Sequence, residues 1–410
     1  MNSVSISVAT AYLTVLVPPM VTVTPLTQTA NETQQAVFTC ELTAGTPPFT
    51  FAWDSGSIPS TEYAIAQLSP TISTLTISAA FVNTHTGSYT CNVTLGREAS
   101  LRRSAEATGS LVVQIPPVIT EFNAVTTDIS LMPTLTCVVR AEPQPSVMWL
   151  DANGADITSS DFTVAALAPM ANFTYTSQLQ FNRLAALLDE MMYTCVASNA
   201  AGRAEQSAML TVNEAPSIVQ LDDVTIVTDQ MAQLVCRVRA KPLAMITWTP
   251  PPGVVTAFTD ATGPDASDSM IQVGILSFIS NNVPADAGMY TCNAVNSVNI
   301  VTGTASLTVL VPPMVTVTPP TQTVNETQQA VFTCEATAGT LPFMFAWDSG
   351  SIPAAEYAIA QVSPTMSLLT ISSAFVTRHT GSYTCNVTLD REASLRRSAE
   401  ATGSFVVQRR

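Results

Sequence analysis

Eight cysteines and two histidines are the residues of this 410-residue chain whose types could support redox, metal or nucleophilic chemistry. The cysteines recur in pairs separated by fifty-odd residues, and no C-x-x-C or C-x-x-H spacing of a redox or zinc site occurs. Four such pairs predict one disulfide per repeat and an oxidising compartment. His85 and His379 occupy equivalent positions, each without a second histidine nearby, so we expect turn residues. The sequence therefore predicts no catalytic residue, no metal site and no cofactor.

An internal repeat organises the chain. Residues 20–113 align without a gap with residues 314–407 and differ at only about fifteen positions. The match extends upstream, because residues 13–19 equal residues 307–313. Residues 1–17 thus correspond to the last strand of an internal repeat, and we expect them to be the final strand of an incomplete preceding domain and not a signal peptide. No apolar run approaches the roughly eighteen residues needed to cross a membrane.

Each repeat of about 97 residues carries the same marks in the same order. A cysteine lies inside an alternating apolar and polar run, as in residues 36–40, which is typical of a half-buried strand. A tryptophan follows about a dozen positions later, then a second alternating strand, and then a Tyr-x-Cys triplet. The third repeat has the sequence Asp-Ala-Gly-Met-Tyr-Thr-Cys at residues 286–292.

With these marks in register four times, residues 18–410 resemble the immunoglobulin superfamily, most closely its intermediate (I-set) type. The resemblance implies an all-β chain of four tandem immunoglobulin-like Greek-key β-sandwiches, each with a disulfide between its sheets, a tryptophan packed on the disulfide and a tyrosine corner. The implied disulfides are Cys40–Cys91, Cys137–Cys195, Cys236–Cys292 and Cys334–Cys385, the core tryptophans are Trp53, Trp149, Trp248 and Trp347, and the corner tyrosines are Tyr89, Tyr193, Tyr290 and Tyr383. The chain departs from the family at Met191, where glycine is usual, and at His85 and His379, where aspartate is usual. An ion pair common at this corner is therefore in question in the first and fourth repeats.

Prolines near residues 18, 116, 216 and 312 open the four units, and almost no linker separates them. The predicted segments are residues 1–17 as the terminal strand, then four immunoglobulin-like domains at 18–114, 115–213, 214–310 and 311–410. Because no Gly/Ser-rich spacer occurs, we expect a semi-rigid, elongated rod.

The charge of the chain limits its partners. The net charge is −15, and Lys241 is the only lysine, so a nucleic-acid partner is excluded. Other proteins, in homophilic or heterophilic contacts, are the expected partners, and acidic glycans are a second candidate.

Two kinds of surface site are candidates. Predicted N-glycosylation sites lie at Asn31, Asn92, Asn172, Asn325 and Asn386. Six arginines gather in two equivalent loops at the sandwich tips, Arg97, Arg102, Arg103, Arg391, Arg396 and Arg397. Such a loop either binds an acidic partner or is a solvated loop with local Arg–Glu pairing. Three aspartates, Asp260, Asp265 and Asp268, lie in a loop that could hold calcium, although their spacing does not fit an EF-hand.

The function that this resemblance implies is a non-catalytic, extracellular or cell-surface protein-binding array. It is expected to act in cell adhesion or as a matrix scaffold, as in hemicentin-like proteins, and to be a fragment of a longer protein. The alternative is the ligand-binding ectodomain of a transmembrane receptor of the kinase or phosphatase type, in which the same domains would bind a signalling ligand.

Overall fold

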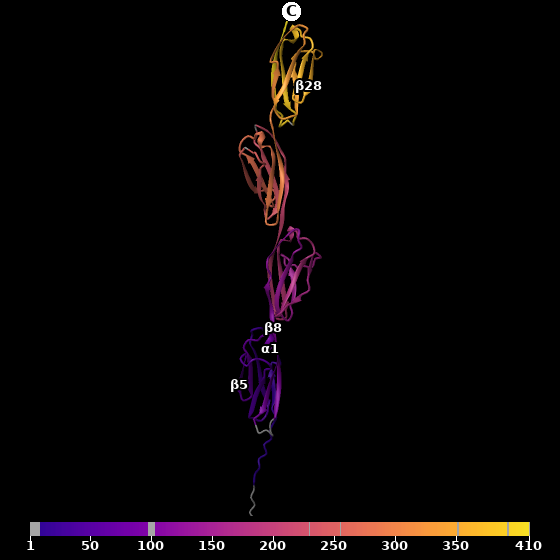
Figure 1. Ribbon diagram of the computed structural model, residues 1–410. Coiled ribbons are helices and arrows are strands. Elements are labelled where there is room, and N and C mark those ends of the chain that lie inside the picture. The colour runs from indigo at the N-terminus through magenta and orange to yellow at the C-terminus, as the bar shows by residue number, and fades with distance from the viewer. Residues whose placement is uncertain are drawn as a thin grey trace, which may run out of the picture. The chain divides into compact units, whose positions relative to one another are not determined.

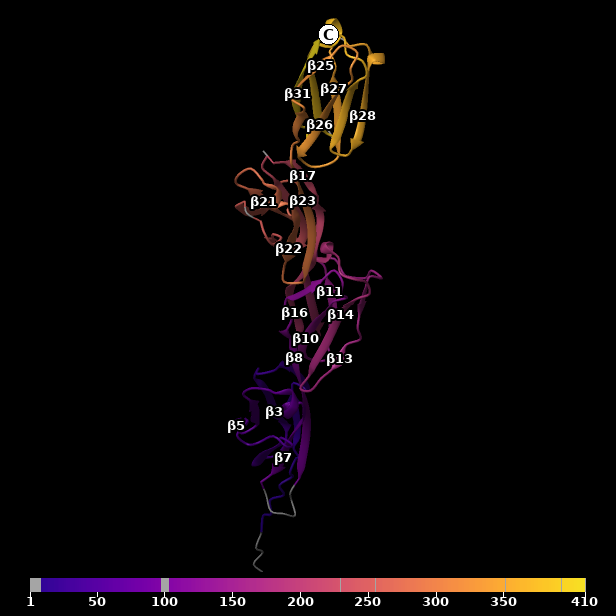
Figure 2. The same ribbon diagram turned by 45° about the horizontal axis from the view of Figure 1, so that its top comes forward.

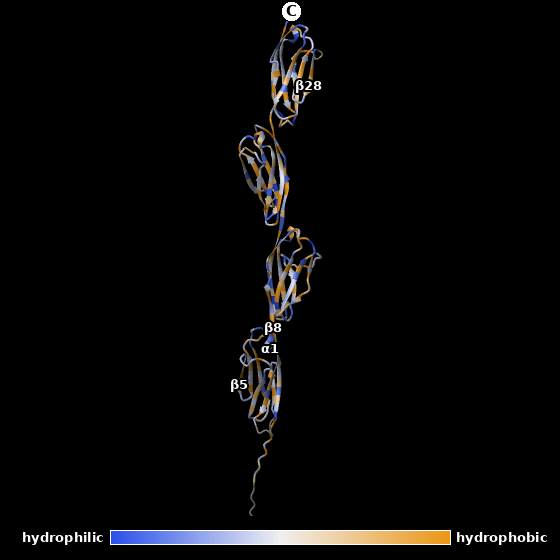
Figure 3. Cartoon of the chain, viewed as in Figure 1, coloured by the Kyte–Doolittle hydropathy of each residue, from blue (hydrophilic) through white to orange (hydrophobic). Residues whose placement is uncertain are grey.

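The computed structural model describes residues 9–96, 103–228, 230–254, 256–350, 352–391 and 393–409. These residues form strands joined by turns and a few one-turn helices, so the all-β prediction is confirmed. The chain divides into two compact units, Met1–Val212 and Asn213–Arg410. Figure 1 shows the β-sandwiches that make up these units. Each unit contains two hydrophobic cores, and each core surrounds one disulfide. Figure 3 shows hydrophobic residues concentrated along the strands of each sandwich.

The first sandwich of unit one has one antiparallel and one mixed sheet. One sheet has the order β1-β3-β6-β5, and the other contains β2, β8, β7 and β4. The bounds are β1 Met20–Thr24, β2 Thr27–Asn31, β3 Ala36–Ala44, β4 Phe49–Asp54, β5 Tyr63–Ser69, β6 Ile72–Ile77, α1 Val82–His85, β7 Gly87–Leu95 and β8 Ser104–Glu121. Pro25 follows β1 and has no N–H for a ladder hydrogen bond, and there the chain crosses to the other sheet, where β2 pairs in parallel with β8.

The 18-residue strand β8 connects the two sandwiches of unit one without a linker. Its first part pairs with β7, and its last part, from Ile115 to Glu121, pairs with β10. Two contacts support this joint: Arg140 Nη1 lies 2.8 Å from Glu32 Oε2, and Asn199 Nδ2 donates to the Ile115 carbonyl at 3.0 Å. The predicted boundary between residues 114 and 115 therefore falls inside a strand.

The second sandwich sets β12, β13, β14 and β10 against β11, β15, β16 and β9. The bounds are β9 Val125–Asp128, β10 Thr134–Glu142, β11 Ser146–Leu150, β12 Phe162–Val164, β13 Ala168–Pro169, β14 Thr174–Phe181, η2 Leu187–Asp189, β15 Met192–Asn199 and β16 Gly202–Leu221. Alternation along β10 buries Leu135, Cys137 and Val139, because successive side chains of a strand point to opposite faces.

The third sandwich belongs to unit two. Its first sheet holds β18, β21 and β20 beside the end of β16, and its second has the order β17-β23-β22-β19. The bounds are β17 Val224–Val227, β18 Gln233–Lys241, β19 Met245–Thr249, β20 Phe258–Pro264, β21 Ile271–Phe278, η3 Pro284–Asp286, β22 Gly288–Val295 and β23 Ile300–Leu310.

The fourth sandwich has the same strand order as the first, as the internal repeat requires. Its sheets are β24-β26-β29-β28 and β25-β31-β30-β27. The bounds are β24 Met314–Thr318, β25 Thr321–Asn325, β26 Ala330–Ala338, β27 Phe343–Asp348, η4 Ala354–Glu356, β28 Tyr357–Ser363, β29 Met366–Ile371, α2 Val376–His379, β30 Gly381–Leu389 and β31 Ser398–Gln408.

Residues 9–19, before β1, belong to no strand. The prediction that residues 1–17 are the last strand of a preceding domain stays a prediction, and residues 1–8 lie outside the described residues.

Candidate functional sites

A disulfide joins the two sheets of every sandwich. The bonds are Cys40–Cys91, Cys137–Cys195, Cys236–Cys292 and Cys334–Cys385, with Cα–Cα distances of 6.2 to 6.5 Å. All eight cysteines are fully buried. On the chain-entropy account, a bridge that closes a loop of this size stabilises its domain by about 4 kcal/mol. These sulfurs therefore have a structural role.

A tryptophan packs beside each bridge, and in three sandwiches its indole N–H has the same partner type. Trp53, Trp149 and Trp347 each donate from Nε1 to a buried serine hydroxyl, at 3.1, 3.0 and 3.1 Å. The acceptors are Ser73, Ser177 and Ser367, each paired in register with the first cysteine of its sandwich. In the third sandwich Gly274 takes this place opposite Cys236, and the buried Trp248 Nε1 has no hydrogen-bond partner.

The four corner tyrosines fasten the turn that precedes the second cysteine. Each hydroxyl donates to the carbonyl four residues earlier, on His85, Asp189, Asp286 and His379, at 2.5, 3.3, 2.8 and 2.7 Å respectively. Burial raises the pKa of each tyrosine to about 12. Their phenols therefore stay neutral at physiological pH and act as hydrogen-bond donors.

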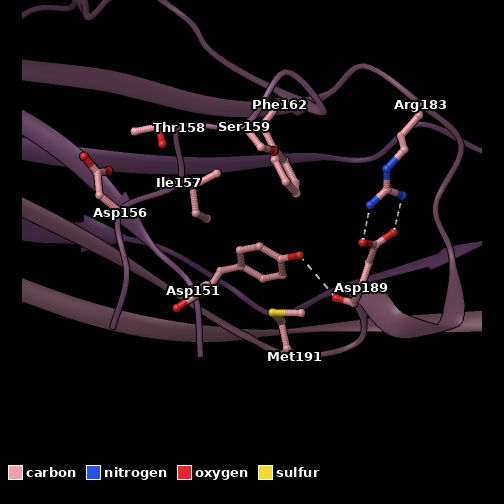
Figure 4. A pocket seen from close by; sticks show the side chains of 10 residues that line it. Asp151, Asp156, Ile157, Thr158, Ser159, Phe162, Arg183, Asp189 and Met191 are labelled. Atoms are coloured by element: carbon pink, nitrogen blue, oxygen red, sulfur yellow. Dashed lines mark hydrogen bonds and ion pairs between the residues drawn. The ribbon is translucent and has the colours of Figure 1, made fainter. Parts of the chain in front are cut away.

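The second sandwich has a bidentate ion pair at this corner (Figure 4). Arg183 donates from Nη1 and Nη2 to the two carboxylate oxygens of Asp189, both at 2.7 Å, and from Nε to Asp161 at 3.0 Å. Burial alone would raise the pKa of Asp189, but hydrogen bonds from Arg183 and from the Ala186 N–H hold it below its ordinary value. The hydrogen bonds that Arg183 donates to Asp189 and Asp161 also raise the pKa of Arg183.

In the first and fourth sandwiches a histidine–glutamate contact takes the place of this ion pair. The Phe81 N–H donates to His85 Nδ1 at 2.9 Å, and the Phe375 N–H donates to His379 Nδ1 at 3.0 Å. Because Nδ1 accepts, the imidazole is neutral and carries its proton on Nε2. That nitrogen faces a glutamate carboxylate, Glu62 at 3.0 Å and Glu356 at 2.8 Å, although the contact at His85 lies off the hydrogen-bond direction.

The burial and the contacts of these two histidines are those of residues that stabilise the fold. Both side chains are 0% exposed, and both ring nitrogens face protein groups. A general base needs a nitrogen that reaches a substrate proton, which neither histidine offers in this arrangement. No sequence pattern singled out the partners Glu62 and Glu356, and the only available signal was their equivalent position in the two repeats.

A cavity of about 310 Å³ opens beside the corner of the second sandwich (Figure 4). Tyr193, Met191, Ile157 and Phe162 line its floor, and the carboxylates of Asp151 and Asp156 belong to its lining as well. The carboxylate of Asp151 accepts hydrogen bonds from the Asn153 and Ala155 N–H groups, and these, chiefly that from Ala155, lower its pKa. Three charged groups of this lining, those of Asp151, Arg183 and Asp189, are thus engaged in hydrogen bonds within the sandwich.

Two of the three aspartates in the third sandwich are paired with arginines, and the third, Asp260, lies in β20. Asp265 forms an ion pair with Arg237, and Asp268 one with Arg239 at 3.0 Å. Among the residues that the structure describes, no three histidine, cysteine or acidic side chains are grouped so as to hold a metal.

Five predicted glycosylation sites fall on turns and strand faces. Asn92 and Asn386 lie in β7 and β30, half-exposed, and each carboxamide oxygen accepts from the threonine hydroxyl of its own sequon, at 3.3 and 3.0 Å. Asn31 and Asn325 end β2 and β25 and are also half-exposed. Asn172 is exposed at the turn before β14, with a φ of 58°. Each amide therefore has an exposed surface.

The structure describes only part of the two arginine loops. Arg97 and Arg102 lie outside the described residues, and Arg103 immediately precedes β8. In the equivalent loop, Arg391 donates to the Leu341 and Asp390 carbonyls, Arg396 to the Arg391 carbonyl, and Arg397 to the Ser394 and Arg396 carbonyls. Hydrogen bonds to carbonyls order the guanidinium groups of Arg391 and Arg396 without neutralising their charge.

Known families match most of the chain. The immunoglobulin domain family matches residues 18–94 and 312–388, and the immunoglobulin I-set domain family matches residues 116–212 and 216–309. The second and third sandwiches therefore match the I-set family that the sequence predicts. The first and fourth sandwiches match the general immunoglobulin family.

Several relatives contain tandem domains similar to these. Hemicentin-1 of Mus musculus is 29% identical over 378 residues, which cover 91% of this chain and 6% of that protein. The cell adhesion molecule DSCAML1 of Mus musculus is 26% identical over 429 residues, covering 99% of this chain and 19% of that protein. A three-domain structure of titin I67–I69, an E-to-A variant, superposes with a TM-score of 0.50 at 21% identity and covers 72% of this chain and 99% of that chain, a likeness of fold.

Disulfide-bonded sandwiches and adhesion-type relatives identify the chain as extracellular or part of an ectodomain. Within the described residues, no helix has the length and apolar character that spanning a membrane requires. From its family matches and from the disulfide, tryptophan and tyrosine corner repeated in each sandwich, the chain belongs to the immunoglobulin superfamily.

Proposed function

We propose that this chain is a non-catalytic, protein-binding array of an extracellular adhesion protein. The observation that carries the proposal is the match to the cell adhesion molecule DSCAML1, which extends over 99% of the chain and so includes all four sandwiches. The chain spans 19% of DSCAML1 and 6% of hemicentin-1, so the role applies to this segment of a longer architecture. A matrix scaffold and a receptor ectodomain are two forms of this role. They differ in the segments of the longer protein outside this chain.

The chemistry of the sandwiches supports a role in binding. The eight thiols are oxidised, the two histidines are buried with Nδ1 occupied, and Asp189 is neutralised by Arg183. These groups stabilise the sandwiches, which leaves strand faces, strand edges and loops to contact a partner.

The four predicted segments at 18–114, 115–213, 214–310 and 311–410 are proposed as the four domains of the array. Every family match begins and ends inside one of these segments, and none crosses a predicted joint. We also propose residues 1–17 as the last strand of a preceding domain, because they repeat the end of the third segment.

N-glycans are proposed at Asn31, Asn92, Asn172, Asn325 and Asn386. Peptide mass spectrometry of secreted chain, after deglycosylation in heavy-oxygen water, measures the occupancy of each asparagine. Bare asparagines at all five positions in secreted material would contradict this proposal.

Acidic glycans are proposed as a second class of partner for the arginine loops. Because Arg391 and Arg396 donate to carbonyls, their charge can interact with sulfate or carboxylate groups. Heparin affinity chromatography of the chain and of a double alanine variant at these two positions tests the idea. Elution of both proteins at the same low salt concentration would rule it out.

Adhesion is tested with fluorescent beads coated through a C-terminal tag. We expect coated beads to aggregate or to bind cells, and we expect beads that carry reduced and alkylated chain to do neither, because loss of the disulfides unfolds the sandwiches. Flow cytometry counts both events. Folded chain that causes neither would overturn the proposed function.

A further inference from the structure

Strands β5 and β28 are edge strands of the first and fourth sandwiches. Each ends the order of its sheet and pairs with one neighbour only, β6 or β29 (Figure 2). Each is seven residues long, with the sequences YAIAQLS and YAIAQVS, and contains no charge, proline or glycine. Such an edge presents a row of backbone N–H and C=O groups that can pair with another strand.

The two intervening sandwiches protect the corresponding edge. In the second sandwich the edge is divided into β12 of three residues and β13 of two, and β13 ends in Pro169. In the third, β20 contains Asp260 and Pro264. Charge, proline and short length are the usual means by which proteins block edge-to-edge pairing. Among the described strands at this edge, only β5 and β28 have neither charge nor proline nor short length, and the irregularity in each is confined to its end, between Gln67 and Ser69 or between Gln361 and Ser363.

Apart from Gln67 and Gln361, the exposed side chains of these edges are apolar. Ile65 and Leu68 are 49% and 68% exposed, and the equivalent Ile359 and Val362 are 46% and 53% exposed. All the predicted glycosylation sites of these two sandwiches lie in strands of the other sheet, at β2, β7, β25 and β30. Glycans there would leave the edges accessible.

We propose that β5 and β28 are homotypic docking strands, each of which pairs antiparallel with β5 or β28 of a second copy of this chain. This inference rests on the proposed adhesive function and specifies a surface for it. The resulting contact is isologous for two β5 strands, and the shared sequence YAIAQ allows β5 to pair with β28 as well.

The sequence of β5 is complementary to itself in this arrangement. When two strands pair about Ile65, Ala64 of one copy faces Ala66 of the other, and Tyr63 faces Gln67. Small residues and neutral polar residues thus meet, with no like charges opposed, although the whole chain carries a net charge of −15.

A hollow beside β5 fits the same register. It has a volume of about 350 Å³ and is lined by Glu62, Tyr63 and Phe81, among others, at the start of the strand. Pairing about Ile65 brings the end of the second strand, which carries Leu68, towards this hollow. Leu68 is 68% exposed, and the hollow offers it the ring of Phe81, itself 44% exposed.

The test compares edge variants with controls on the opposite edge of the same sheets. Ile65→Lys with Ile359→Lys adds charge to both docking strands, whereas Met20→Lys with Met314→Lys adds the same charge to β1 and β24, where these methionines are 62% and 64% exposed. Sedimentation velocity of the glycosylated, secreted chain measures self-association. We expect the edge variant to weaken association by about tenfold or more and the control to leave it unchanged. A wild-type chain that stays monomeric at its highest soluble concentration, or equal weakening by both variants, overturns the proposal.

Disulfide trapping tests the register without relying on the lysine variants. Facing residues of an antiparallel pair have Cα atoms about 4.5–5.5 Å apart, within reach of a disulfide. Ile65→Cys should therefore give a covalent dimer on non-reducing gels, and Met20→Cys should not. Equal trapping by both variants, or no trapping by Ile65→Cys, counts against the docking strand. If beads that carry the lysine edge variant aggregate as wild-type beads do, the proposed adhesive function is supported and the proposed docking strands are contradicted.

Discussion

Ile246 occupies the space that a side chain at Gly274 would need. A Cβ added at Gly274 would lie 2.5 Å from Ile246 Cγ2, closer than nonbonded carbon atoms approach. Gly274 stands where the other three sandwiches have the serine that accepts from tryptophan, and Trp248 Nε1 accordingly has no partner. In the third sandwich, a packing contact has replaced a buried hydrogen bond.

Gly274→Ser should therefore destabilise the third sandwich, although it restores the residue found in its neighbours. The overpacked side chain costs about 1–3 kcal/mol, more than one hydrogen bond returns. Hydrogen exchange of peptides from this sandwich measures the change. Unchanged or slower exchange would show that Ile246 can move aside.

In the Ile246→Ala background, Gly274→Ser should stabilise the third sandwich, whereas in the wild-type background it should destabilise it. Ile246→Ala alone leaves a cavity and costs about 2–5 kcal/mol, but the double variant should lose less than the sum of the single losses. The reason is that the serine then fills part of the cavity and accepts from Trp248. Strictly additive losses in the double-mutant cycle would contradict this coupling.

Ser177→Ala should destabilise the second sandwich by about 1–3 kcal/mol, because it leaves the fully buried Trp149 Nε1 without an acceptor. Ser160→Ala is the matched control: this serine is exposed, and its loss should change stability by less than about 0.5 kcal/mol. Calorimetric unfolding of the chain compares the two. Equal effects would show that the indole contact contributes nothing.

The Arg183–Asp189 pair should make the second sandwich sensitive to acid. The pKa of Asp189 is lowered in the folded state, so the pair stabilises the fold above the ordinary aspartate pKa of about 4, and this contribution is lost as pH falls below that value. Asp189→Asn should lower stability at neutral pH and flatten its acid dependence, while the exposed Asp156→Asn should not. Parallel acid profiles for wild type and Asp189→Asn would refute this assignment.

The corner tyrosines should make all four sandwiches sensitive to alkali. Burial raises their pKa to about 12, so the neutral phenol is favoured in the fold. Their contribution is complete below the unfolded pKa of about 10 and is lost as pH rises towards 12. Phenolate absorbance during alkaline titration should show a late component that coincides with unfolding. Tyr193→Phe should reduce this component, and an unaltered titration would contradict the role of Tyr193.

The sequence alone was sufficient for the fold class and for the positions of the main structural residues. Alternation around Cys40 or Cys137 is a local pattern, since successive side chains of a strand alternate between faces whatever the rest of the chain does. The fourfold order of cysteine, tryptophan and Tyr-x-Cys then implied sandwiches with one bridge each, and these bonds are present in the structure.

Only the tertiary structure decided which side chains meet across the loops and which edges stay open. Trp53 and Trp149 find their serines 20 and 28 residues away, and His379 meets Glu356 across 23 residues, because loops of different length bring different positions into register. Likewise, β5 is an edge because no strand lies beyond it in the sheet order, which its own sequence does not encode. Local periodicity depends on neighbouring residues, whereas these contacts depend on the closure of the whole sandwich.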